Sequence, residues 1–128
     1  MATRSIIGGV CNDNKVRAVY VHFDGYGHLK YLEKICRTTN DVTAFLEIGD
    51  RSGICDEKGY EDGLGYRFEG DSIEALKKWM LEGSEWDSEY LYIWTGEKWE
   101  RYEFRFDYKA EAECRKTNNI LIENYENQ

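Results

Sequence analysis

Two histidines and an aspartate stand close together in the stretch His22-Phe23-Asp24-Gly25-Tyr26-Gly27-His28. Two imidazoles and a carboxylate could bind a metal ion or move protons. In an extended segment, His22 and Asp24 point to the same face, as two metal ligands must. A third ligand is not evident, and a loop-closing aspartate beside two hydrogen-bonding histidines explains the same residues. A metal-dependent hydrolase using His22, Asp24 and His28 is therefore an alternative hypothesis, and we assign neither catalytic residues nor metal ligands.

The four cysteines lack the spacing of a metal site. Cys11, Cys36, Cys55 and Cys114 are separated by 25, 19 and 59 residues, unlike the paired Cys-x-x-Cys of zinc centres. We interpret them as thiols that behave as small, half-buried hydrophobes. No glycine-rich segment closely precedes a helical pattern, as a phosphate-binding loop must. No cofactor is expected.

The charge balance is strongly acidic. The 128 residues include 17 basic and 25 acidic side chains, a net charge of −8, which disfavours direct binding to nucleic acid or to an anionic membrane. Residues 1–40 carry six basic and three acidic residues, whereas residues 41–128 carry 11 and 22. The excess acid is either a solvated face or an electronegative patch that meets a basic partner.

Aromatic residues gather among these acids. Five Phe, four Trp and ten Tyr make up 15% of the chain, and the segment 86–94, continued by Trp99 and Tyr102, mixes Trp and Tyr with Glu and Asp. Such rings serve as anchors in protein interfaces, although packing of a sheet explains them equally. The candidate partner-binding residues are Glu85, Trp86, Asp87, Glu89, Glu97, Glu100 and Glu103.

The elements that must position these residues follow from periodicity and turn chemistry. We expect a hairpin of strands 5–10 and 16–22, helices over 29–37, 40–48 and 72–82, and an aromatic hairpin of strands 90–94 and 98–104. Thr39 or Asn40 is expected to cap the second helix and Asp71 the third. We expect an irregular connection over 50–65, a short helical turn over 110–116 and an edge strand over 120–122. The prediction is a single α+β domain, residues 1–128, with an antiparallel sheet packed against two or three short helices.

Part of the chain resembles a known group of proteins. Arg4-Ser5-Ile6-Ile7-Gly8, followed by Tyr20-Val21-His22-Phe23-Asp24-Gly25-Tyr26, resembles a group of small, uncharacterised proteins of bacteriophages and prophages. Their pattern is Ser-x-Ile-Gly and then Tyr-x-His-Trp-Asp-Gly-Tyr, with Phe23 here in the place of the Trp. The resemblance covers about the first 50 residues, including the Gly49-Asp50 step. It implies a viral origin, in which small acidic proteins often act against host defence.

These expectations combine into a ranked set of functions. The first is a non-enzymatic, cytoplasmic inhibitor of the anti-CRISPR or anti-restriction kind, a nucleic-acid mimic that occupies a basic groove on a host defence effector. The second is sequestration of a small nucleotide defence signal by arginines and tyrosines, in a pocket that could lie between the protomers of a homodimer. No run approaches the ~20 apolar residues that span a bilayer, so no membrane association is expected.

Overall fold

The computed structural model describes residues 4–22, 27–51, 53, 65–82, 88–105 and 113–116. The described elements, in chain order, are β1 (Arg4–Val10), β2 (Val16–Val21), α1 (His28–Ile35), α2 (Thr39–Glu47), β3 (Phe68–Gly70), α3 (Ile73–Leu81), β4 (Ser88–Trp94), β5 (Trp99–Arg105) and β6 (Glu113–Lys116). Both predicted hairpins and all three predicted helices are present within one or two residues of their expected bounds, because turn chemistry and hydrophobic period are local signals.

The strands form one sheet in the order β3-β2-β1-β4-β5-β6. Neighbouring strands are antiparallel except for β1 and β4, which run parallel, with Ile6 opposite Leu91. The α+β prediction is confirmed, but the sheet is mixed rather than purely antiparallel. The physical reason is the long connection from β2 through α1, α2, β3 and α3, since only a crossover of this kind can return a strand in parallel orientation.

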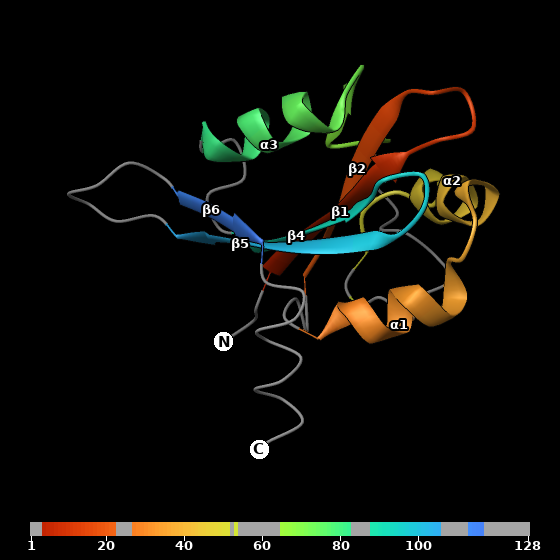
Figure 1. The fold of residues 1–128 in the computed structure, drawn as a ribbon, viewed down its shortest axis with the longest axis horizontal. Coiled ribbons are helices and arrows are strands. Elements are labelled where there is room, and N and C mark those ends of the chain that lie inside the picture. Colours follow the sequence, from red (N-terminus) through yellow and green to blue (C-terminus); the bar gives the residue numbers. More distant parts are fainter. Residues whose placement is uncertain are drawn as a thin grey trace.

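Helices cover both faces of the sheet (Figure 1). One face carries Ile6, Ala18, Leu91 and Ile93 and packs against Leu76 and Met80 of α3. On the other face Ile7, Val19, Val21 and Tyr92 pack against α1 and α2. The division follows from the alternation of side chains along each strand. We call the two clusters the α3-side core and the α1/α2-side core.

The helix caps differ by one residue from their expected positions. Thr38, rather than Thr39 or Asn40, caps α2: its hydroxyl accepts from the Asp41 amide while the Asp41 carboxylate accepts from the Thr38 amide. Ser72, rather than Asp71, caps α3 by accepting from the Ala75 amide. Before α2 the adjacent residues Thr38, Thr39 and Asn40 are all able to cap, and before α3 Asp71 and Ser72 are, so local preference does not choose among them.

Further expectations concern the segments outside the two hairpins and three helices. Residues 113–116, expected within a helical turn, form β6, where Glu113 pairs with Arg105. Pairing with the neighbouring strand overrides the weak helical pattern, as is common for short segments. The predicted strand over 120–122 and most of the predicted irregular connection lie outside the described residues.

Within the described ranges, no helix is long and apolar enough to cross a membrane.

Candidate functional site

The structure separates the two histidines of the metal hypothesis. His22 lies just after β2, where its Nδ1 is 2.7 Å from the Tyr20 hydroxyl, and Tyr20 packs on the α3-side core. His28 is buried at the start of α1, with its ring 5.5 Å from that of Tyr92 in the α1/α2-side core. Asp24 lies outside the described residues. Among the residues that the structure describes, no group of three His, Cys, Asp or Glu side chains could hold a metal ion.

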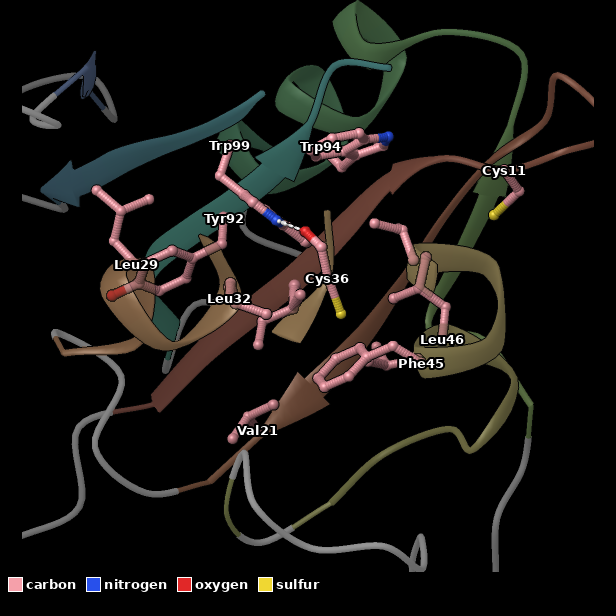
Figure 2. Close-up of a cluster of buried hydrophobic side chains, with 13 residues drawn as sticks. Cys11, Val21, Leu29, Leu32, Cys36, Phe45, Leu46, Tyr92, Trp94 and Trp99 are labelled. Carbon is pink, nitrogen blue, oxygen red and sulfur yellow. Dashed lines mark hydrogen bonds between the residues drawn. The ribbon is translucent and has the colours of Figure 1, made fainter. Parts of the chain in front are cut away.

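The aromatic rings expected at a partner surface lie in the core. Tyr92, Trp94, Trp99 and Tyr102 are all buried, so the sheet-packing interpretation is confirmed for these four. The Trp99 indole nitrogen donates to the Cys36 carbonyl at 2.9 Å, the dashed bond in Figure 2. The Trp94 indole nitrogen donates to the Thr39 hydroxyl at 3.1 Å. Their polar edges thus hold α1 and α2 on the sheet instead of facing a partner.

The three candidate carboxylates whose side chains the structure describes, Glu97, Glu100 and Glu103, do not form one surface. Glu97 is exposed in the turn between β4 and β5. The Glu100 side chain is 14% exposed and accepts from the Tyr102 hydroxyl at 2.9 Å, so a structural contact engages it. Glu103 lies opposite Tyr90, and strand alternation places it on the other face from Glu100. Glu85, Trp86 and Asp87 lie outside the described residues, and for Glu89 only the backbone in β4 is described.

Acidic residues adjoin one end of the sheet in the sequence. At this end, which we call the loop end, β1 and β4 begin together at Arg4 and Ser88, and β2 and β5 end. Three stretches of the chain are next to these strand ends in sequence: 23–26 follows His22, 83–87 precedes Ser88, and 106–112 joins β5 to β6. They hold five acidic residues and one basic residue, a net charge of −4. Glu97 and Glu100 lie toward the opposite end, where β4 turns into β5.

A polar cluster that sequence reasoning did not find lies along β2. The Asp50 carboxylate is buried, accepts from the Tyr20 amide at 2.8 Å and pairs with the Arg67 guanidinium at 2.6 Å. The Arg67 guanidinium also lies over the Tyr20 ring, 5.5 Å from its centroid. We call Tyr20, His22, Asp50 and Arg67 the Asp50 cluster. A phenol, an imidazole and a guanidinium together are suited to binding an anionic or aromatic ligand.

The sequence held only a weak signal for this cluster. Tyr20, His22 and Gly49-Asp50 belong to the N-terminal sequence pattern described above, which singles them out without suggesting that they touch. Arg67 stands 17 residues after Asp50, and no periodic pattern joins them. Their contact depends on β3 pairing with β2, a tertiary event.

Buried ionisable groups on the α1/α2 side act in packing. Burial raises the pKa of Tyr92 to about 12, and the hydrogen bond with Arg101 partly opposes that shift. Burial also raises the pKa of the Cys36 thiol to about 11, so at neutral pH it is protonated and a poor nucleophile. Cys11 is likewise buried, so the interpretation of the cysteines as small hydrophobes is confirmed for Cys11 and Cys36, whereas Cys55 and the Cys114 side chain lie outside what the structure describes.

The comparisons with family models, with curated proteins and with solved structures give no match to this chain.

Proposed function

We propose that this protein is a small acidic inhibitor of phage origin that binds a basic surface of a host defence effector, of the anti-CRISPR or anti-restriction kind, and thereby competes with nucleic acid. The observation that carries the proposal is the charge: the chain has a net charge of −8, and the three stretches next to the strand ends at the loop end carry −4. Loops held by a rigid framework are where binding residues most often lie.

The electrostatics of such a pair favour fast encounter. A groove that binds nucleic acid is lined with Lys and Arg, and a protein with a net charge of −8 would be attracted toward it. Tyr92, Trp94 and Trp99 are buried, so they cannot anchor a partner. The proposed contact relies on the carboxylates, with Trp86 as the remaining candidate ring. Binding should therefore weaken as added salt screens the charges.

The candidate residues divide by their place along the β4–β5 hairpin. Glu85, Trp86, Asp87 and Glu89 precede or begin β4, and Glu103 lies opposite Tyr90, so these five belong to the loop end. Glu97 and Glu100 lie toward the other end, and Glu100 is engaged by Tyr102. We therefore assign the proposed contact to the first five and expect little from Glu97 and Glu100.

The test compares two variants of equal charge. Glu85→Gln with Asp87→Asn removes two carboxylates near the loop end, and Glu74→Gln with Glu97→Gln removes two exposed carboxylates elsewhere. The readout is displacement of labelled DNA or RNA from purified CRISPR and restriction nucleases of the host, at 50 and 200 mM salt. We expect the first variant to associate roughly tenfold more slowly and the second to behave as wild type. Equal behaviour of the two variants, or the absence of displacement by the wild-type protein, would refute the proposal.

The Asp50 cluster favours a second candidate function, sequestration of a nucleotide defence signal. The Arg67 side chain is 44% exposed beside the half-buried Tyr20 and His22, a combination that could contact a phosphate and a base. Candidate cyclic nucleotides would be incubated with the protein and recovered by heat denaturation, with Arg67→Gln as the test variant and Arg37→Gln as the control. An unchanged ligand released by wild type but not by Arg67→Gln supports sequestration. A chemically altered ligand indicates an enzyme, and failure of capture rejects both.

A further inference from the structure

The outer edge of β2 is only half covered by its neighbouring strand. β3 pairs with Val16, Arg17 and Ala18, and the next outward contact, Arg67 N to the Ala18 carbonyl, is 2.9 Å long. Beyond Ala18, β2 continues to Val21 without a β3 partner. An uncovered edge presents backbone donors and acceptors that can pair with a strand from another molecule.

Residues 49–51 take the place of the missing strand. The Arg51 amide donates to the Tyr20 carbonyl at 2.9 Å, and the His22 amide donates to the Arg51 carbonyl at 3.1 Å. Next to these bonds, on the side of Ala18, the Tyr20 amide donates to the Asp50 carboxylate at 2.8 Å, so a side chain replaces a backbone acceptor. We call residues 49–51 the clip.

Buried contacts hold the clip from both sides. Gly49 turns the chain out of α2 with φ of +84°, a conformation that side chains disfavour. The Arg51 guanidinium is buried, donates to the Phe45 carbonyl at 2.7 Å and lies 3.8 Å from the centroid of the Phe45 ring. The second Asp50 oxygen pairs with Arg67 at 2.6 Å. A short segment that could not form a strand by itself is thus fixed against β2.

We infer that the clip closes the outer edge of β2 to strand addition by a second copy of this chain, and that Asp50 is the positioning residue that holds it closed. A second copy is the relevant partner because every copy carries the same edge, and two such edges can pair antiparallel around a two-fold axis. Val19 and Val21 give this part of β2 the β-branched character that favours pairing. This protective role is independent of the proposed function.

Two substitutions at one position separate the roles of the carboxylate. Asp50→Asn keeps an oxygen that can accept from the Tyr20 amide but loses the ion pair with Arg67, whereas Asp50→Ala loses both. The readouts are amide hydrogen exchange at Tyr20, with Ile7 in the centre of the sheet as the internal control, and molecular mass by sedimentation over a range of protein concentrations. Arg67→Gln, which keeps the backbone bond to Ala18, serves if Asp50→Ala does not fold.

We expect Asp50→Ala to speed exchange of the Tyr20 amide about ten- to hundredfold, the loss expected for a hydrogen bond to a charged group. Its mass should rise with concentration above that of wild type, and Asp50→Asn and Arg67→Gln should show smaller changes in the same direction. Wild-type exchange at Tyr20 in Asp50→Ala would overturn the inference. Faster exchange without association would overturn it too, because the opened edge would then not attract a second copy.

Discussion

Replacement of Gly8 by alanine should destabilise the protein, because the added methyl group has no room between the sheet and α3. An alanine Cβ at this position would lie 2.7 Å from the Arg17 carbonyl oxygen, 2.8 Å from the Ala18 Cβ and 3.0 Å from the Leu76 Cδ2. Gly8 pairs with Ala18 in the centre of the sheet, so neither of the first two atoms can move by side-chain rotation. The sheet or the helix must shift instead.

The expected size of the effect is the difference between two opposing contributions. Inserting a methyl group into a well-packed core costs about 1–3 kcal/mol. Alanine also restricts the unfolded chain, which stabilises the folded state by about 0.4–1 kcal/mol. The net loss should be about 1–2 kcal/mol, which lowers the Tm of a chain of this length by roughly 4–7 °C.

Urea unfolding followed by tryptophan fluorescence would measure this loss, and a double-mutant cycle would assign it. Leu76→Ala removes the helix atom closest to the new methyl group, so Gly8→Ala should cost roughly 0.5 kcal/mol less in that background. A Gly8→Ala protein as stable as wild type would refute the close packing of α3 on β1. An equal cost in both backgrounds would show that Leu76 is not a cause of the strain.

Three other predictions test the packing and the charges. Trp99→Phe should lower the free energy of unfolding by about 2 kcal/mol, because it leaves the buried Cys36 carbonyl without its indole donor. Trp94→Phe should lower it less, because the partly buried Thr39 hydroxyl can turn to water. Equal shifts of the urea midpoint in the two variants would contradict this. Cys36 should resist alkylation at pH 8 until the protein unfolds, because burial raises its pKa to about 11; rapid labelling of the folded protein, seen by mass spectrometry, would disprove it. Hydrogen bonds from Arg17 and the Lys15 amide lower the pKa of Asp13 from 3.8 to about 2. The stability that the Asp13 carboxylate contributes to the folded protein is therefore present above about pH 4 and is lost as the pH falls toward 2. Urea midpoints between pH 2 and 5 should fall less steeply in Asp13→Asn, and an unchanged slope would count against this ion pair.

The aromatic hairpin illustrates how far sequence could predict the candidate site. The strands and their turn were predictable, because β-branched and aromatic residues surround Thr95-Gly96-Glu97. Whether the rings of Trp94 and Trp99 face solvent was not predictable, because the alternation is imperfect and both faces of the strand carry rings. The answer depends on α1 and α2, which cover that face of the sheet; Thr39, which contacts Trp94, lies 55 residues away in sequence, and Cys36, which contacts Trp99, lies 63 residues away.

The two histidines show the same limit. Their spacing in the sequence suggested a shared site, yet His22 contacts Tyr20 on one side of the sheet and His28 contacts Tyr92 on the other. Five residues of chain separate them, and only the direction of β2 and the start of α1 decide where each ring lies. By contrast Asp50 and Arg67, with no shared motif, are in direct contact.

The amino-acid sequence by itself determined the two hairpins, the three helices, the α+β class and the strong net negative charge. These properties depend on neighbouring residues or on composition, so short-range periodicity and counting suffice. The tertiary structure alone decided that β1 and β4 are parallel, that Tyr92, Trp94, Trp99 and Tyr102 are core, and that Asp50 and Arg67 meet beside β2. Each of these features depends on which distant segments pack together. The local sequence pattern is compatible with many arrangements of the chain, and packing of the hydrophobic faces selects one of them.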